Sequence, residues 1–304
     1  MSLQRYFDLH CDTITHFESL TASGAAFSLD HLPENAVWAQ CCAIFIPDSL
    51  RGADAIRCYE HARDTLYRET AQNAARIDFC RTGRDVEAAF AGGRNAAILT
   101  VESGAALAGD LSRVENLWND GVRAMTLVWN GENELGCGQS DPDRGLTAFG
   151  RDCIREMERL GMLIDVSHLS DRGFRDVCET AKRPFIATHS NARAVCPHRR
   201  NLTDGQILEI VRRGGLIGLN YYRDFLGGDE PEWFYRHVEH FLALGAEKVL
   251  SLGSDYDGAE IPAWLERPER LPALREGLRS RGLREETVND LMCGNALRFW
   301  KNRF

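Results

Sequence analysis

Short apolar runs of strand length alternate with longer amphipathic stretches along the whole chain of 304 residues. The runs that predict buried strands are residues 6–10, 39–46, 96–101, 123–128, 163–166, 184–188, 216–220 and 249–253. Stretches with helical periodicity lie between them, at residues 53–75, 113–119, 147–160, 172–181, 204–213 and 233–244. Repeated strand–helix units of this kind are typical of a parallel sheet covered by helices.

Helix-capping residues support the predicted ends of the helices. Ser170 and Thr203 stand where helix N-caps are expected, and Gly161 and Gly214 stand just after two helical stretches. No internal repeat and no linker rich in Pro, Gly or Ser divides the sequence. Eight strand–helix units in one domain favour a single (β/α)₈ barrel over residues 1–304, with an open doubly wound sheet as the alternative.

The composition and charge of the chain limit the kinds of partner that it can bind. The chain is 44% hydrophobic and 27% charged, which is typical of a globular protein, and its formal net charge is -9. An acidic chain lacks the basic excess that binding to nucleic acid requires, so we expect no nucleic-acid partner. The sequence has no apolar stretch long enough for a signal sequence or a membrane span, which predicts a cytoplasmic protein without a membrane partner.

The ten cysteines are scattered and form no C-x-x-C pair. We interpret them as reduced core residues, with a reactive thiol at Cys11 as the alternative.

Metal-binding side chains follow the predicted strands. They are His10 and Asp12 after the first strand, Glu102 after the third, His168 after the fifth, His189 after the sixth and Asp255 after the eighth. Taken singly, each has an ordinary structural explanation as a core histidine, a helix cap or a turn residue. Together they lie at strand ends that converge on one face of a barrel, where barrel active sites are built. We therefore expect a metal site.

Three imidazoles and two carboxylates suit zinc, although manganese and cobalt accept similar ligands. Five ligands exceed what one tetrahedral ion with an open position can use. Two ions that share a bridging carboxylate and a bridging water, roughly 3.5 to 4 Å apart, fit this ligand set better. With a bridging hydroxide such a site keeps a net positive charge, which stabilises a developing oxyanion. The other histidines are assigned no ligand role: His16, His31, His61, His198, His237 and His240.

Several segments resemble the membrane (renal) dipeptidase family and its bacterial relatives, within the broader amidohydrolase-like barrels. The resemblance runs through most of the chain, and residues 156–168 (EMERLGMLIDVSH) are its most characteristic segment. The other segments are 8–12 (DLHCD), 101–104 (VESG), 188–193 (THSNAR), 199–201 (RRN), 253–258 (GSDYDG) and 294–298 (GNALR).

The resemblance implies a dipeptidase with two zinc ions. His10 and Asp12 would bind one ion, His168 and His189 the other, and Glu102 would bridge them. It further implies that the enzyme accepts dipeptides with a C-terminal D-residue. By analogy with the family, it also implies a homodimer.

The resemblance also implies roles in catalysis and substrate binding. Asp255 would act as the acid/base for the attacking water and the leaving amine, while Arg200 would receive the carboxylate of a small dipeptide substrate. A positioned carboxylate suits proton transfer, and a guanidinium matches a carboxylate in two-pronged geometry.

Trp129 departs from the family pattern. After the fourth strand the best-known members place a histidine that touches the substrate, and the aligned segment here has Trp129. The alternative is that Trp129 only packs the barrel mouth.

Two other functions remain open. One is another amidohydrolase-type reaction on a lactone or small amide. Such enzymes are expected to carry an H-x-H motif after the first strand and a lysine at a strand end, and this sequence has neither. The other is a catalytically silent barrel that only binds its ligand, which metal content and a dipeptide assay would distinguish from an enzyme.

Overall fold

A closed parallel barrel forms the centre of the protein, in a computed structural model that describes residues 3–304. Its strands are β1 (Gln4–Cys11), β2 (Ala36–Phe45), β4 (Asn95–Glu102), β5 (Ala124–Thr126), β8 (Leu163–Asp165), β9 (Ile186–Ala187), β10 (Leu216–Leu219) and β11 (Leu250–Leu252). They follow one another in the order β2-β1-β11-β10-β9-β8-β5-β4, and pairing of β2 with β4 closes the ring. The predicted (β/α)₈ barrel is confirmed, and the open sheet is wrong because the ring is closed.

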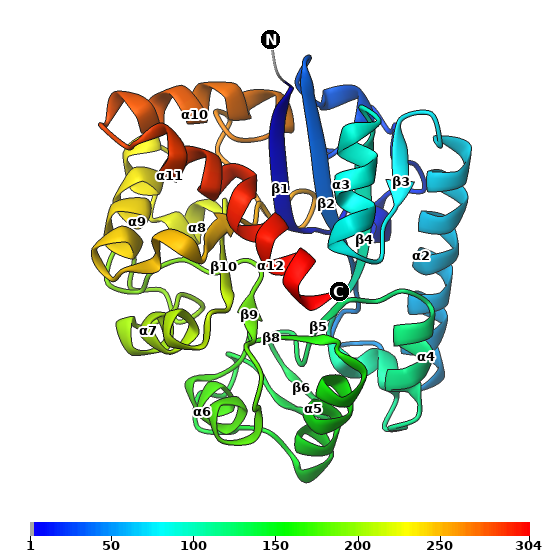
Figure 1. Cartoon of the computed structure of the whole chain (residues 1–304). Coiled ribbons are helices and arrows are strands. Elements are labelled where there is room, and N and C mark those ends of the chain that lie inside the picture. The colour runs from blue at the N-terminus through cyan, green and yellow to red at the C-terminus, as the bar shows by residue number, and fades with distance from the viewer. Residues whose placement is uncertain (1–2) are drawn as a thin grey trace.

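Helices surround the strands on the outside (Figure 1). They are α1 (Thr13–His16), α2 (Ala53–Gln72), α3 (Gly83–Ala91), α4 (Arg113–Asn119), α5 (Ala148–Leu160), α6 (Asp171–Thr180), α7 (Asp204–Arg213), α8 (Arg223–Leu226), α9 (Pro231–Ala243), α10 (Leu271–Ser280), α11 (Glu285–Asn289) and α12 (Asn295–Arg303). The predicted caps are present: the Ser170 and Thr203 side chains accept backbone hydrogen bonds, and Gly161 and Gly214 are left-handed.

The structure adds elements that the sequence analysis did not predict. Strand β3 (Ile77–Phe79) pairs with the start of β4, and α3 follows it. A small hairpin of β6 (Glu132–Asn133) and β7 (Gly136–Cys137) lies in the loop after β5. At the C-terminus, α10, α11, a π-helix at Asp290–Gly294 and α12 continue the chain beyond the eighth strand.

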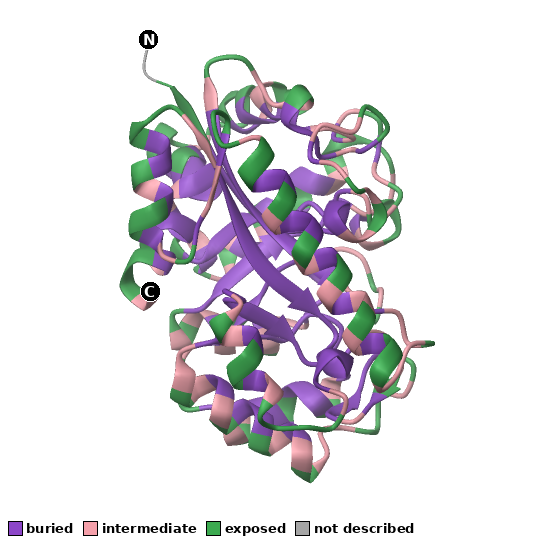
Figure 2. Ribbon diagram, turned by 90° about the vertical axis from the view of Figure 1, so that its right-hand side faces the viewer, coloured by how far each residue is buried: buried purple, intermediate pink, exposed green. Residues whose placement is uncertain are grey.

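Apolar side chains form two clusters because neighbouring residues of a strand point to opposite faces. The smaller cluster joins side chains from the beginnings of ring strands, such as Phe7, Ala124 and Leu163, with Trp300 of α12. Side chains from strands around a ring meet only in its interior, so α12 closes the N-terminal end of the barrel. The larger cluster packs the outer face of the strands against the helices, and Figure 2 shows the strands as the most buried part of the molecule.

All ten cysteines are free thiols. Cys11 is fully buried, and burial raises the pKa of its thiol well above the ordinary value. The alternative of a reactive Cys11 is therefore disfavoured, because the thiolate is the reactive form.

The backbone leaving β9 passes very close to two glycines on neighbouring strands. A Cβ atom at Gly218 would lie 1.9 Å from the carbonyl oxygen of Thr188, and one at Gly253 would lie 2.0 Å from the same atom. Only glycine allows this close approach, which places the following residue, His189, at the barrel mouth.

We predict that Gly218→Ala lowers the free energy of unfolding by about 1–3 kcal/mol, because the added methyl group collides with a backbone carbonyl. Gly205→Ala is the matched control, since a Cβ there finds nothing nearer than Thr203 Oγ1 at 4.0 Å. Urea-induced unfolding of both variants measures the difference. Equal stability of the two variants would contradict the steric argument.

Candidate metal centre

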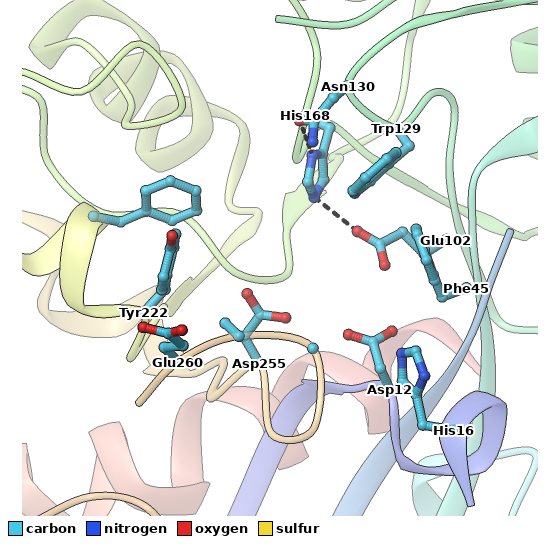
Figure 3. Close-up of a pocket in the computed structure, with 13 residues that line it drawn as sticks. Asp12, His16, Phe45, Glu102, Trp129, Asn130, His168, Tyr222, Asp255 and Glu260 are labelled. Carbon is cyan, nitrogen blue, oxygen red and sulfur yellow. Dashed lines mark hydrogen bonds and ion pairs between the residues drawn. The ribbon is translucent and has the colours of Figure 1, made fainter. Parts of the chain in front are cut away.

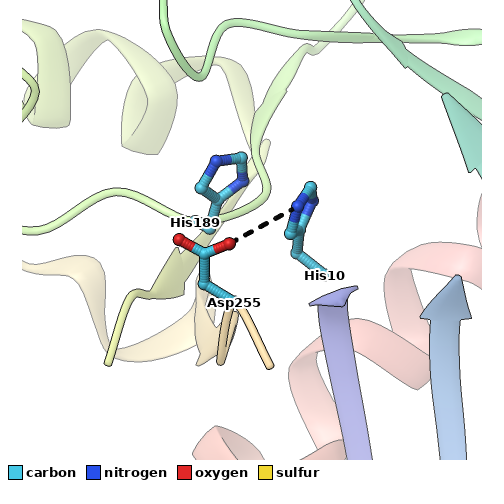
Figure 4. A group of neighbouring side chains, drawn as sticks. All are labelled: His10, His189 and Asp255. Carbon is cyan, nitrogen blue, oxygen red and sulfur yellow. Dashed lines mark ion pairs between the residues drawn. The ribbon is translucent and has the colours of Figure 1, made fainter. Parts of the chain in front are cut away.

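The barrel brings together the six side chains that the sequence placed at strand ends. His10 lies in β1 and Glu102 ends β4, while the other four follow their strands within three residues. Their ligand atoms form three groups in which all atoms lie within 4.8 Å of one another: His10, Asp12 and Glu102; Glu102, His168 and His189; and His10, His189 and Asp255. Figure 4 shows the last group, in which His189 and Asp255 face His10.

Unusual backbone conformations direct two of these side chains inward. His168 has φ 68° and Asp255 has φ 65°, both in the left-handed region that non-glycine residues rarely adopt. Ser103, directly after Glu102, has φ 90°. Such conformations cost about 1–3 kcal/mol each and concentrate at functional sites, where the surrounding structure imposes them.

His168 and His189 present unprotonated nitrogens to each other. His168 Nδ1 lies 2.9 Å from Asn130 Oδ1, and His189 Nδ1 lies 2.8 Å from Thr188 Oγ1, whose hydroxyl donates to Asp165. Both Nδ1 atoms must therefore carry the proton of a neutral ring. The two Nε2 atoms are then lone-pair acceptors only 2.9 Å apart, which is favourable only if a cation lies between or beside them.

Glu102 faces both halves of the centre. Its Oε1 lies 2.7 Å from His168 Nε2 and 3.5 Å from His189 Nε2, whereas its Oε2 lies 3.6 Å from His10 Nε2. Figure 3 shows this carboxylate between His168 and Asp12. Two oxygens that point to different histidines are what a bridging ligand requires.

His10 lies among three carboxylates. Its buried Nε2 has no hydrogen-bond partner among the described residues and lies 3.5 Å from Asp12 and 3.8 Å from Asp255. Burial alone would lower the pKa of His10. The negative charges of Asp12 and Glu102 outweigh this effect and raise the pKa of His10 well above its usual value. Burial and the charge of Glu102 raise the pKa of Asp12. The donor set thus fits divalent cations, which would neutralise this excess of buried negative charge.

Positive charge from Arg200 acts on the other two imidazoles. Burial lowers the pKa of His168, and burial with His10 lowers the pKa of His189 well below its usual value; Arg200 adds to both effects. Both rings are therefore neutral at neutral pH, which is the form that binds a metal.

Asp165, which the sequence analysis did not single out, organises the layer beneath the candidate ligands. It is buried and accepts hydrogen bonds from the backbone of Ser167 and Thr188 and from the hydroxyls of Thr126 and Thr188, at 2.5–3.0 Å. These contacts join β5, β8 and the end of β9. Since Thr188 Oγ1 donates to Asp165, it can only accept from His189, which fixes the tautomer of that ring.

A cavity of about 420 Å³ opens over the candidate ligands. Four aromatic residues line it, namely Phe45, Trp129, Tyr222 and Phe225. Trp129, which the sequence analysis placed at the substrate, lies on the wall with its ring 4.9 Å from that of Phe45. The other non-ligand lining residues are His16, Asn130, Gly258, Ala259 and Glu260.

Several of these lining residues were missed by the sequence analysis. Phe45 ends β2 and Tyr222 follows β10, so the rule used for the ligands could have found both. His16 lies in α1 and Glu260 in the loop after β11, and no sequence signal distinguishes them.

Arg200 is not among the residues that line the cavity. It is 4% exposed, donates to Ser190 Oγ and to the His189 carbonyl, and its Nε has no partner. Among the described residues no carboxylate lies within ion-pair distance of its guanidinium, which stands over the ring of Phe225. Burial lowers its pKa to about 10, so it stays charged at neutral pH.

A closed parallel barrel whose strand ends carry this set of imidazoles and carboxylates defines the class of metal-dependent hydrolase barrels. The sequence model of one family, described as membrane dipeptidase (peptidase family M19), matches residues 1–303. The chain belongs to this family of metallo-dipeptidases.

Individual relatives agree with this family. A protein in the pqqA 5′ region of Klebsiella pneumoniae is 33% identical over 246 residues, covering 76% of this chain and 91% of the relative. A Schizosaccharomyces pombe protein named as a dipeptidase is 34% identical over 238 residues, covering 74% of this chain and 57% of that protein. A Rhodobacter sphaeroides metallopeptidase, solved with a phosphinate mimic of L-Ala-D-Ala, superposes with a TM-score of 0.93 at 27% identity over 100% of both chains.

No helix within residues 3–304 combines the length and apolar character needed to cross a membrane.

We predict that Asp165→Asn weakens metal binding by about 10- to 100-fold, because it disturbs the hydrogen bonds that orient His189. Asp176→Asn is the control: this buried carboxylate pairs with Arg151 and Arg172 and touches no candidate ligand. Titration against a chelator of known affinity measures metal binding by each folded variant. If both variants lose affinity equally, the effect of Asp165 is general destabilisation.

Proposed function

We propose that this chain hydrolyses the peptide bond of dipeptides with two zinc ions, bound by His10 and Asp12 on one side and by His168 and His189 on the other. The position of Glu102 is the observation that carries this proposal. Each of its oxygens faces a different histidine group, at 2.7 and 3.6 Å, so one carboxylate could serve two ions. Bound divalent ions would lower the pKa of a water molecule between them and polarise the scissile carbonyl.

Asp255 is the proposed acid/base. It lines the cavity, and its Oδ2 accepts a hydrogen bond of 2.9 Å from Asn220 Nδ2, which holds the carboxylate in one orientation. Its Oδ1 lies 3.8 Å from His10 Nε2 and faces the candidate ligands. From this position the carboxylate would take the proton of the attacking water and return it to the leaving amine.

Arg200 is proposed to attract the free C-terminal carboxylate. Its guanidinium is buried and charged and has no carboxylate partner in the described chain, which is an unfavourable state that an anionic substrate would relieve. Its guanidinium lies over the ring of Phe225, which lines the cavity, so a substrate carboxylate would reach Arg200 beside this ring.

The aromatic wall is proposed to contact the substrate side chains. A cavity of about 420 Å³ has the size of a small-ligand site, and Trp129 with Phe45 makes one side of it apolar. Tolerance of a C-terminal D-residue is supported by the L-Ala-D-Ala mimic bound to the Rhodobacter sphaeroides metallopeptidase.

We predict that Asp255→Asn keeps about two equivalents of metal but lowers kcat at least about a hundredfold, in line with removal of a positioned acid/base. Glu260→Gln is the control, because Glu260 lines the same cavity but is mostly exposed. Metal content and turnover of L,L- and L,D-dipeptides are measured on the same zinc-loaded preparations. Loss of metal from Asp255→Asn would make Asp255 a ligand, and a wild type with one equivalent would overturn the two-ion site.

We predict that Arg200→Ala loses most of the preference for a dipeptide over its C-terminal amide, because only the free carboxylate pairs with the guanidinium. Truncating one partner of a buried charge pair costs about 2–5 kcal/mol. Arg199→Ala is the control, since this neighbouring residue is exposed and its guanidinium donates a hydrogen bond to the Gln139 carbonyl. The ratio of kcat/KM for the two substrates is the measurement. If wild type cleaves both equally well, Arg200 is not the carboxylate receptor and a broader amidase is indicated.

A further inference from the structure

A second cavity of about 440 Å³ lies beside the N-terminal end of the barrel, away from the candidate metal centre. Its lining residues come from the beginning of β1, from α10, α11 and the π-helix, and from the first turn of α12. Figure 1 shows the beginning of β1 and α10 at the top of the molecule. Arg5 in its wall and His10 at the metal centre lie five residues apart on β1, which corresponds to about 16 Å along an extended strand. The two cavities are therefore separate.

Three arginines line this second cavity, in a protein whose formal net charge is -9. They are Arg5, Arg275 and Arg279. Arg5 and Arg279 are exposed; Arg5 forms no ion pair within the described residues, and its guanidinium lies over the ring of Phe90. Arg275 is the most buried of the three, with 8% of its side chain exposed, and its only hydrogen bond to the described part of the chain is from Nη2 to Glu285 at 3.1 Å.

The carboxylates of the wall neutralise these arginines only in part. Glu285 is shared between Arg275 and Arg279, Arg279 also pairs with Glu276 at 3.5 Å, and Asp290 is shared between Lys248 and Arg298. Glu285 and Asp290 thus each serve two cations, and within residues 3–304 the guanidinium of Arg5 and part of that of Arg275 have no hydrogen-bond partner. Burial raises the pKa of Tyr6 to about 12, and the positive charges of Arg275 and Arg279 oppose this rise.

We propose that this cavity binds a compact anion with two or more negative oxygens, either a phosphate group or a polycarboxylate. Guanidiniums present paired N–H donors that match the oxygens of both groups. A buried arginine with unused donors that face a cavity is costly unless an acceptor completes its hydrogen bonds. The volume is similar to that of the candidate active site, so the ligand would be a small molecule.

Isothermal titration calorimetry of the zinc-loaded protein tests this site, with inorganic phosphate in one arm and tricarballylate, which carries three carboxylates, in the other. We expect one of them to bind the wild type, and Arg5→Gln and Arg279→Gln each to weaken that binding at least about tenfold. Arg155→Gln is the matched control, because its exposed guanidinium on α5 lies outside the cavity. All three variants should retain wild-type kcat/KM for a dipeptide.

Three results would overturn the proposal. The first is no binding of either anion, and the second is equal binding by wild type and all three variants, which would place the anion at the metal centre. The third is competition between the bound anion and a dipeptide substrate. The first two results do not depend on the dipeptidase mechanism, because binding is measured without turnover, and the third requires only that the dipeptide binds.

Discussion

The convergence of electron-rich groups around Glu102 is the constraint on which the rest of the structure depends. Two imidazole nitrogens 2.9 Å apart, with a carboxylate oxygen 2.7 Å from one of them, are held together in a nearly dry environment. Lone pairs at these distances repel each other unless cations are present, so the surrounding chain must supply the organisation. Asp165 accepts a hydrogen bond from the Thr188 hydroxyl, which in turn orients His189. Asn130 orients His168 through a hydrogen bond with its Nδ1 atom.

The barrel makes this arrangement of the candidate ligands possible. Strands from distant parts of the sequence end at one rim, while α12 fills the opposite end with Trp300. The glycines at 218 and 253 let the backbone after β9 approach its neighbours. The left-handed conformations of His168 and Asp255 then turn their side chains inward. The strain at these positions is tolerable because the closed ring of strands beneath them is rigid.

Sequence patterns predicted the ring and the candidate ligands because both follow from the same feature, an apolar strand that ends in a polar residue. They did not predict α3, because it follows β3, which was itself not expected, and they assigned no helix after the eighth strand. They also missed Asp165, since a carboxylate inside a strand gives no sign of the four donors that tertiary structure brings to it. The contact between Arg200 and Phe225 could not be predicted either, because it depends on how the loop before α7 folds against α8.

In the proposed function, Arg200 would link metal binding to substrate binding through one charge. Its guanidinium helps to lower the pKa of both His168 and His189, which favours the neutral imidazoles that a metal requires. The same charge is buried without a carboxylate partner among the described residues, so its desolvation is compensated only in part by Ser190 and the His189 carbonyl. A substrate carboxylate would complete that compensation. Selection for a free C-terminus would then arise from this buried cation, and the apolar wall of Trp129 and Phe45 would be left to discriminate among side chains.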